Sequence, residues 1–254
     1  MTSTIDILND KARFAAVLAR APKRSYACVA CRDSGWTVRK DDRGWYSYTR
    51  RCKCQEAAII AGQLAAASVP ECLVNNTLAT WPRTDDERAI LQRFRAHIAR
   101  ATLFGPGALV LGPVGTGKTG LLVGALKDLL HRTIASGGFA RYADANRLID
   151  RSRGMLDFGS TERIEAELVH PCVDAYVLAL DEVGRRADRD AHGVVSRIIR
   201  DRHASGRLTI IASNCTRGDL SVVGSDIESR IVEMCGGESG IFTLTGPDRR
   251  KFRE

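Results

Sequence analysis

The sequence has no run of about 18 apolar residues, the length that a membrane-spanning helix requires. Its most apolar stretch, residues 57–69, is too short and too rich in alanine for that purpose. Residues 1–6 lack the basic and then apolar pattern of a secretory signal peptide. Internal repeats and low-complexity tracts are also missing. These absences predict a globular protein of the cytoplasm.

The cysteine content and the net charge narrow the class of protein further. Eight cysteines in 254 residues point away from a disulfide scaffold and toward metal ligands or free thiols in a reducing compartment. The formal net charge of +8 favours an anionic partner, for which nucleic acid is the leading candidate, although a basic protein without such a partner remains open. The length allows one large domain, or one standard domain with a small module.

Residues 112–119 read GPVGTGKT and match the phosphate-binding pattern GxxxxGK[ST] without a gap. A short apolar run at 108–111 precedes them, and residues 120–130 follow with apolar positions at helical spacing. A glycine-rich turn between strand and helix directs backbone N–H groups at phosphate oxygens. We expect Lys118 to reach the β- and γ-phosphates of ATP or ADP, and Thr119 to ligate Mg²⁺. The expected nucleotide-binding residues are Gly112, Pro113, Val114, Gly115, Thr116, Gly117, Lys118, Thr119 and Gly120.

Acidic and amide residues follow two later apolar runs. Residues 175–180 are followed by Asp181 and Glu182. From the end of such a strand, an aspartate assists Mg²⁺ and contacts the nucleotide complex. A glutamate directly after it can polarise the water that attacks the γ-phosphate. Residues 208–212 lead to Asn214, which can hydrogen-bond that phosphate and the water. The pair Asp181 and Glu182 therefore favours ATP hydrolysis.

Four cysteines fall within 27 residues, Cys28 and Cys31 as CxxC and Cys52 and Cys54 as CxC. Two tight pairs joined by a 20-residue loop favour a structural four-thiolate Zn²⁺ site, with a redox dithiol as the alternative. The loop predicts a β-hairpin whose aromatic residues pack a small core. Residues 32–53 carry seven basic and three acidic residues, so this surface suits nucleic acid or a protein partner. The scattered cysteines, expected to be small buried apolar residues, are Cys72, Cys172, Cys215 and Cys235.

The remaining pattern predicts an α/β fold. Residues 3–21, 57–67 and 84–101 read as helices, and strands are expected at 138–142, 175–180, 208–212 and 241–244. Strands that alternate with helices indicate a parallel sheet covered on both faces, with the nucleotide at the carboxyl ends of the strands. We place a domain boundary near residue 67. The expected domains are a zinc-binding domain at 1–67 and a P-loop ATPase domain at 68–254.

The order of motifs, CVACRDSGW and RRCKC, then GPVGTGKT, LALDEVG, ASNCT and ESRI, resembles the DnaC-like replicative helicase loaders. These loaders are AAA+ ATPases of bacteria and phages, and the IstB-type transposition helpers share their ATPase part. The resemblance covers residue 25 to the end. It implies the AAA+ strand order, sensor 1 at Asn214 and an arginine finger at Arg230, which would complete the site of a neighbouring subunit.

The resemblance also implies a helical insertion that contacts single-stranded DNA. It falls at residues 146–158, where Arg147, Arg151 and Arg153 recur, and where the lack of aromatic residues favours contacts with the DNA backbone. Only 24 residues follow Arg230, as the reduced lid of the family implies, with Arg249 and Arg250 as candidates for sensor 2.

Three functional hypotheses follow. The first is an ATPase of the bacterial or phage-encoded cytoplasmic machinery that loads the replicative DNA helicase onto single-stranded DNA. In it the zinc-bearing domain holds the helicase, and the ATPase domains associate with one another. The second is an IstB-like transposition helper on duplex DNA, and the third is a zinc-ribbon adaptor in which ATP is a structural switch. The N-terminal cysteine cluster counts against the second, and Glu182 against the third.

Overall fold

The computed structural model of the chain describes residues 26–82, 84–101, 105–133, 139–156, 161–184 and 193–252. These residues divide into two compact units, one ending at Gln55 and the other beginning at Glu56. Helix α2 (Lys53–Ala66) contains that division and ends beside the domain boundary expected near residue 67, which stays a prediction. The helix predicted at 3–21 lies outside the described residues. None of the described helices combines the length and the apolar content that crossing a bilayer demands.

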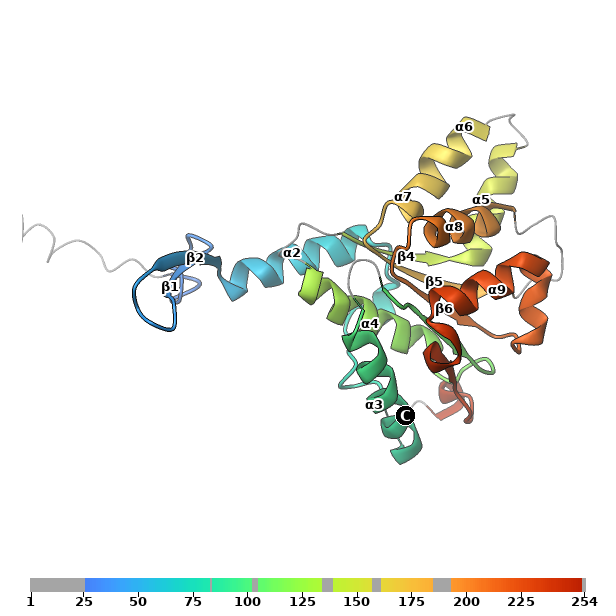
Figure 1. The fold of residues 1–254 in the computed structure, drawn as a ribbon, viewed down its shortest axis with the longest axis horizontal. Helices are drawn as coiled ribbons and strands as arrows, with labels where there is room; N and C mark the ends of the chain where they lie inside the picture. Colours follow the sequence, from blue (N-terminus) through green and yellow to red (C-terminus); the bar gives the residue numbers. More distant parts are fainter. Residues whose placement is uncertain are drawn as a thin grey trace, which may run out of the picture. The chain divides into compact units, whose positions relative to one another are not determined.

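The first unit contains the predicted antiparallel hairpin (Figure 1). Strand β1 (Trp36–Lys40) pairs with β2 (Ser47–Arg51), and Trp36 lies opposite Arg51. The turn is closed by the Asp41 carboxylate, whose Oδ1 accepts a 2.9 Å hydrogen bond from the backbone N–H of Tyr46. A backbone bond from the N–H of Cys52 to the Gly35 oxygen, 2.8 Å long, ties the end of β2 to the start of β1.

The second unit is built on a five-stranded sheet in the order β4-β5-β6-β3-β7 (Figure 1). Every pairing in this sheet is parallel. The strand and helix alternation expected from the sequence is therefore confirmed, and each strand begins within two residues of its predicted start. The strands are β3 (Ala108–Leu111), β4 (Ala140–Asp144), β5 (Val177–Val183), β6 (Thr209–Ser213) and β7 (Ile241–Thr243).

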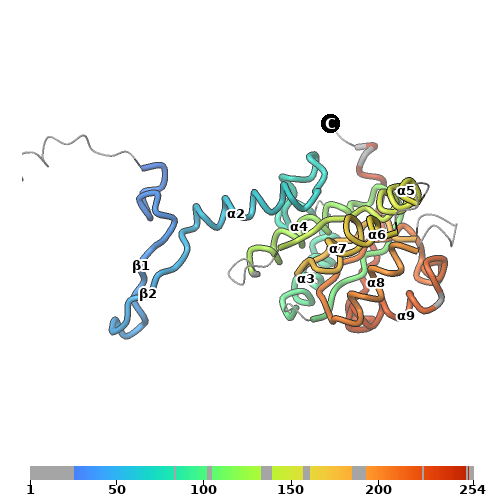
Figure 2. The backbone as a smooth tube through the Cα atoms, turned by 90° about the horizontal axis from the view of Figure 1, so that it is seen from above, coloured from blue at the N-terminus to red at the C-terminus, as the bar shows by residue number. Residues whose placement is uncertain are grey.

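Helices cover both faces of this sheet, because the fully buried strand residues point alternately to either side. One core cluster packs α2, α3 and α4 against residues such as Val110 and Ile210. The other packs α5, α8 and α9 against residues such as Leu109 and Ile211, and α5, α6 and α7 follow one another along this side (Figure 2). The helices are α3 (Asp85–Ala99), α4 (Lys118–Thr133), α5 (Ala145–Leu156), α6 (Thr161–Ile164), α7 (His170–Val173), α8 (Gly193–Ala204) and α9 (Ser225–Met234).

Short helical turns complete the unit. The π-helix η3 joins α6 to α7, and a 3₁₀ turn, η7, follows the last strand. Helix α3 starts with a capping box, in which Thr84 Oγ1 accepts the Glu87 backbone N–H at 3.3 Å and the Glu87 carboxylate accepts the N–H of Thr84. These turns are η1 (Glu71–Leu73), η3 (Glu165–Val169), η5 (Gly218–Val223), η6 (Gly237–Gly240) and η7 (Arg249–Phe252).

A fully buried arginine contacts the amino ends of β5 and β6, away from the phosphate-binding turn at the carboxyl end of β3. Arg202 of α8 donates to the Thr209 hydroxyl at 2.8 Å, and burial lowers the pKa of its guanidinium to about 9. Its other hydrogen bonds go to backbone carbonyls that precede β5 and β6. Those acceptors are the oxygens of Cys172, Val173, Ala175 and Leu208, at 2.6–2.9 Å. A single cation thus supplies donors to several buried carbonyl groups, of which the Leu208 oxygen also accepts the backbone N–H of Leu178 at 3.2 Å.

Candidate functional site

The phosphate-binding turn leaves the buried strand β3 and enters α4 at Lys118. Gly112, Gly115 and Gly117 all have positive φ, at 150°, 83° and 95°. A Cβ at Gly112 would lie 2.4 Å from the Leu244 carbonyl oxygen, so only glycine fits where the turn passes the end of β7. The sequence context that the motif requires, a buried strand followed directly by a helix, is present.

Lys118 lies inside the curl of this turn, with 7% of its surface exposed. Its Nζ donates to the carbonyl oxygens of Gly112 and Pro113, both at 2.7 Å. The Thr116 hydroxyl donates to the same Pro113 oxygen at 2.9 Å. The ammonium group is therefore held at the centre of a ring of backbone groups, where an anion would meet both the lysine and the start of the helix.

Asp181 lies near the carboxyl end of strand β5 and is 2% exposed. Its Oδ2 accepts a 2.9 Å hydrogen bond from the Tyr142 hydroxyl, and its Oδ1 accepts the Glu182 backbone N–H at 2.9 Å. Burial raises the pKa of this carboxyl above its usual value, while a hydrogen bond from the Thr119 side chain opposes the rise. A hydroxyl and a carboxylate in contact at the phosphate end of α4 form a pair of oxygen donors that fits Mg²⁺.

Glu182 follows in a strained conformation with φ of 58°, where the pairing of β5 with β6 shifts register. This kink points its carboxylate toward two amides, because the Nδ2 atoms of Asn146 and Asn214 each lie 3.4 Å from Glu182 Oε2. Asn214 was expected from the sequence to contact the γ-phosphate and the attacking water, which stays a prediction. Asn146 was not expected in this role, and the available signal was its place two residues after the end of β4, beside the carboxyl end of β5.

A cavity of about 480 Å³ opens over the phosphate-binding turn. Val114, Gly115, Gly117, Lys118, Thr119 and Gly120 line it together with Glu182. The opposite wall comes from the segment that precedes α3 and from η7, and of its residues only Arg249 was expected near the nucleotide, as a candidate for sensor 2. Those residues are Pro70, Cys72, Leu73, Asn76, Thr80, Trp81 and Arg249. The structure thus brings Lys118, Thr119 and Glu182 to one cavity, with Asp181 in contact with Thr119.

Trp81 and Arg249 form one rim of the cavity. The Trp81 indole N–H donates to the Gly117 oxygen at 2.8 Å, and the Arg249 guanidinium lies 4.8 Å from the ring centroid. Arg249 also donates to the Trp81 oxygen at 2.9 Å and to the Glu87 carboxylate. A Cβ at Gly117 would meet the Arg249 guanidinium carbon at 2.6 Å. Of the two sensor 2 candidates, Arg249 of η7 therefore packs against the phosphate-binding turn. The side chain of Arg250 lies outside the described residues.

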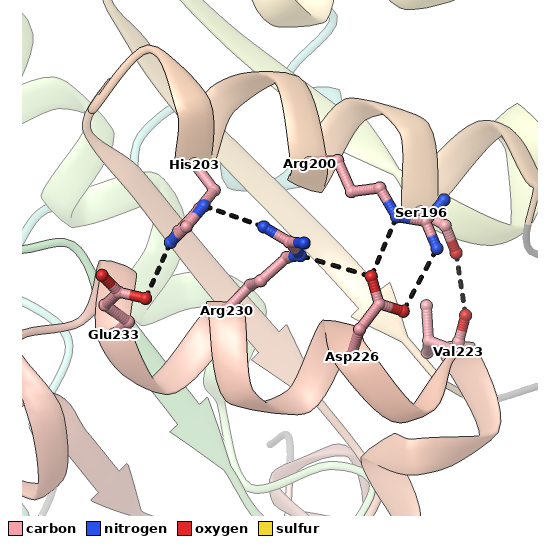
Figure 3. Close-up of polar contacts among 7 residues, drawn as sticks. All are labelled: Ser196, Arg200, His203, Val223, Asp226, Arg230 and Glu233. Atoms are coloured by element: carbon pink, nitrogen blue, oxygen red, sulfur yellow. Dashed lines mark hydrogen bonds and ion pairs between the residues drawn. The ribbon is translucent and has the colours of Figure 1, made fainter.

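Arg230 lies on α9 and is absent from the lining of this cavity. Its Nε donates to Asp226 Oδ2 at 3.3 Å, and one terminal nitrogen lies 3.2 Å from His203 Nδ1 (Figure 3). Arg200 of α8 also donates to both oxygens of Asp226, at 3.0 and 3.1 Å. Within its own chain Arg230 is part of a polar layer between α8 and α9. It is not placed to contact a nucleotide bound in the same chain.

The arginines expected to contact DNA lie on the exposed face of α5. Arg147, Arg151 and Arg153 are all exposed, whereas Leu148 and Ile149 of the same helix are buried in the core. Arg151 pairs with Glu167 of η3 at 3.5 Å. The expected segment continued to residue 158, of which 157 and 158 lie outside the described residues.

The four N-terminal cysteines come together. Their Sγ atoms lie within 4.8 Å of one another, with 3.7 Å between Cys28 and Cys52 and 3.5 Å between Cys31 and Cys54. Four sulfurs at 2.3 Å from one Zn²⁺ in a tetrahedron are about 3.8 Å apart, so this arrangement fits the metal. Asp33 supports the first pair, because its carboxylate accepts the backbone N–H groups of Ala27 and Cys28.

Two expectations about side-chain burial were wrong. The aromatic residues of the hairpin do not form a small core, since Trp36, Trp45 and Tyr46 are 47%, 77% and 73% exposed. The sulfur atoms of the four cysteines come together without a contribution from these rings. Among the scattered cysteines, Cys172 and Cys235 are buried as expected. Cys72, in contrast, is exposed at the cavity, and Cys215 is half-buried.

The sequence matches no protein-family model, and no curated protein matches it at a significant level. Solved structures do match. The crystal structure of the DnaC helicase loader has a TM-score of 0.58 and 24% identity, over 69% of this chain and 100% of that one. DnaI has a TM-score of 0.56 and 18% identity, over 72% of this chain and 95% of that one. The replication initiator DnaA bound to AMPPCP and single-stranded DNA has a TM-score of 0.53 and 18% identity.

The DnaA match covers 71% of this chain and 52% of that one, so the chain spans about half of the initiator. The second unit therefore has the AAA+ P-loop fold, a parallel sheet covered by helices, as the sequence predicted. Helicase loaders and a replication initiator are among its structural neighbours. At these identities the similarity establishes the fold alone.

Proposed function

We propose that the chain is an ATPase that loads a ring-shaped replicative helicase onto single-stranded DNA in the cytoplasm of a bacterium, encoded by the cell or by a phage. The observation that carries the ATPase part is the set of contacts around Glu182. Its carboxylate lines the cavity with Lys118 and is held by two amides. Structures of loaders with the same fold, together with the four-cysteine cluster, support the more specific role.

In the proposed reaction the turn at 112–119 binds the phosphates of ATP through its backbone N–H groups, and Lys118 moves from its two carbonyl partners to the β- and γ-phosphates. Thr119 and Asp181 would hold Mg²⁺, which when bound neutralises charge on the phosphates. Glu182 orients and deprotonates the attacking water. Asn214 donates to the γ-phosphate and keeps the glutamate in place.

Arg230 would act on a neighbouring subunit. Its position outside the cavity of its own chain, with bonds to Asp226 and His203, suits a residue that is offered across an interface between ATPase domains. There it would stabilise the charge of the transition state, an effect of about 10³–10⁵ in rate for known arginine fingers.

We assign the helicase contact to the zinc-binding domain at 1–67 and hydrolysis to the domain at 68–254. DNA contact is assigned to Arg147, Arg151 and Arg153, whose guanidinium groups meet phosphates and not bases. In the holoprotein, Cys28, Cys31, Cys52 and Cys54 would bind a structural Zn²⁺ that keeps the hairpin folded.

The test combines three variants of the full chain. Lys118→Ala should lose ATP binding, Asp181→Asn should bind ATP but lose Mg²⁺-dependent turnover, and Arg230→Ala should bind ATP normally as a monomer. Each purified protein is then assayed for turnover, retention of a replicative helicase and loading of that helicase on a circular single strand. Equal loss of ATP binding in all three would contradict the assigned roles. A preference for duplex over single-stranded DNA at matched salt would instead indicate a transposition helper.

Zinc is measured on the same proteins. The wild-type chain should contain one equivalent of zinc, and Cys31→Ser should lose the metal and the helicase contact but keep ATP binding. Helicase retention that survives removal of the metal with a chelator would contradict the role of residues 1–67. Turnover indistinguishable from background in the zinc-loaded protein would favour an adaptor that uses ATP as a structural switch.

A further inference from the structure

One face of the β1–β2 hairpin carries tyrosine and arginine side chains. Side chains on paired strands alternate between two faces, and the register places Arg39 opposite Tyr48 and Thr37 opposite Arg50 on the same face. Tyr46 extends this face, because the backbone N–H of Asp41 donates to its carbonyl oxygen at 2.9 Å and continues the ladder. We call Arg39, Tyr46, Tyr48 and Arg50 the tyrosine face.

The tyrosine face has no partner among the residues that the structure describes. Tyr46 and Tyr48 are 73% and 52% exposed, and Arg39 and Arg50 are also exposed. Neither guanidinium makes a hydrogen bond or ion pair with a described residue. Asp41, at the end of this face, accepts the N–H of Tyr46. These rings and cations are therefore available for a ligand, and the cysteine cluster holds the hairpin that presents them.

The charge of the hairpin favours a polyanion as that ligand. Residues 36–51 contain five basic and two acidic residues. Two residues of an extended strand, such as those from Tyr46 to Tyr48, advance the backbone by about 6.8 Å, twice the rise of about 3.4 Å per nucleotide in a stacked strand. Exposed aromatic rings flanked by arginines are the pattern on which single strands bind, with stacking for bases and cations for phosphates.

We propose that the tyrosine face binds single-stranded DNA, with Tyr46 and Tyr48 stacking on bases and Arg39 and Arg50 contacting phosphates. The choice of DNA rests on the proposed function, whose substrate is a single strand. This site is separate from the arginines of α5 and belongs to the unit that ends at Gln55. The helicase contact is then left to other residues of 1–67.

The opposite face of the hairpin supplies matched controls. It carries Val38 and Lys40, and Trp36 with the Arg51 guanidinium 5.7 Å from its ring centroid. Val38→Ala and Lys40→Ala therefore change the same strand as Arg39→Ala without touching the tyrosine face. A variant qualifies for comparison when it keeps its zinc content and its ATP affinity, which excludes loss of folding as the cause of a defect.

The experiment measures binding of a fluorescein-labelled (dT)20 to the full chain at several KCl concentrations. The double variant Tyr46→Ala/Tyr48→Ala should weaken binding by about tenfold or more. Arg39→Ala should lower the slope of log affinity against log salt by about 0.7, the value for one phosphate contact on a single strand. Val38→Ala should change the affinity by less than about twofold. Equal effects of the tyrosine and control variants would overturn the proposal.

Ultraviolet crosslinking of the same oligonucleotide locates the contact directly. Trypsin should release residues 44–50 as one peptide, and a nucleotide adduct on Tyr46 or Tyr48 is the expected result. Adducts confined to 56–254 would overturn the proposal. If the tyrosine variants bind (dT)20 normally but fail to retain the helicase, the face is a protein interface and the proposal is wrong.

Failure of this site and failure of the loader function give different results. Absence of helicase retention or turnover in the wild-type chain, with crosslinks still on Tyr48, would remove the loader function and leave the DNA site. Normal loading by the double tyrosine variant, with unchanged (dT)20 affinity, would remove the DNA site and leave the loader function.

Discussion

The Tyr142 hydroxyl donates a 2.9 Å hydrogen bond to Oδ2 of Asp181, so that one strand of the sheet fixes the carboxylate at the end of its neighbour. Burial raises the pKa of Tyr142 far above its usual value, which keeps the phenol a donor. The second carboxylate oxygen accepts the backbone N–H of Glu182. Asp181 therefore has one orientation, and the Thr119 side chain is in contact with it.

Tyr142→Phe should weaken the Mg²⁺ dependence of turnover. A hydrogen bond to a charged group contributes about 1.5–3 kcal/mol, so the Mg²⁺ concentration for half-maximal turnover should rise by about tenfold or more. Binding of ATP without metal should be unchanged. Tyr176→Phe is the matched control, since the centroid of the Tyr176 ring lies 6.3 Å from that of Phe139 and its hydroxyl makes no hydrogen bond to Asp181. An unchanged Mg²⁺ titration in Tyr142→Phe would refute the positioning role.

Asn146→Ala and Asn214→Ala should each lower turnover by about tenfold or more without changing ATP affinity, because each amide holds the carboxylate of Glu182. Stopped-flow binding and steady-state hydrolysis separate the two effects. Asn75→Ala, an exposed asparagine outside the cavity, should behave as wild type. If both variants lost ATP binding in proportion to turnover, the amides would be binding residues and not orienting residues.

Mixing two inactive variants should restore turnover if Arg230 acts between subunits. Arg230→Ala retains a complete cavity, and Lys118→Ala retains the arginine, so mixed assemblies contain some complete sites. Hydrolysis is measured while the ratio of the two proteins is varied at constant total concentration. Arg200→Ala, which removes the other partner of Asp226, controls for disturbance of the polar layer. Mixtures that associate but stay inactive would exclude a shared site.

Acid should reduce the contribution of Asp226 to stability. The Arg200 guanidinium, the main cause, holds the pKa of this carboxyl at about 2, below its ordinary 3.8. A carboxyl with a lowered pKa in the folded state stabilises the fold above its ordinary pKa and loses that effect as the pH falls toward about 2. The Tm of the wild type minus that of Asp226→Asn should therefore be constant from pH 7 to pH 5 and narrow below pH 4. A difference in Tm that increases as the pH falls would contradict a lowered pKa of Asp226 in the folded state.

Arg202→Met should destabilise the second unit by about 3–5 kcal/mol, because it removes the guanidinium donor from the buried carbonyl groups of Cys172 and Ala175. Arg202→Lys should recover little, since an ammonium lacks the planar fork that reaches separate acceptors. Urea denaturation monitored by circular dichroism gives the free energies of unfolding. Arg197→Met, on the exposed side of the same helix, should change stability by less than about 1 kcal/mol. A small effect at Arg202 would show that water replaces its hydrogen bonds.

Much of the fold could be predicted because a parallel sheet buries its strands on both faces, which leaves continuous apolar runs such as 108–111. The phosphate-binding turn and the cysteine spacing are local patterns, so short segments of sequence carried them. The end of β5 was predicted three residues too early, at 180 and not at Val183. The charged side chains of Asp181 and Glu182 interrupt the apolar pattern before the strand ends, where its pairing with β6 also shifts register.

Other features depend on contacts between distant residues. Asn146 meets Glu182 across 36 positions of sequence, and no local pattern marks that meeting. The exposure of Tyr46 and Trp45 was missed because a small domain usually needs its aromatic residues for a core. A metal can take the place of such a core, and the four cysteines are the residues that would bind one here. The alternation of strands and helices in the sequence could not predict the order of the strands in the sheet. Only the resemblance to AAA+ proteins suggested that order.

The rim formed by Trp81 and Arg249 has a consequence for synthesis of the chain. Its two members are separated by 168 positions, and Arg249 bonds Trp81, Glu87 and the turn at Gly115. A ribosome-bound nascent chain that has exposed only the first strands of the sheet would thus have an incomplete nucleotide-binding site. Binding of ATP should accordingly wait until residue 249 has left the exit tunnel.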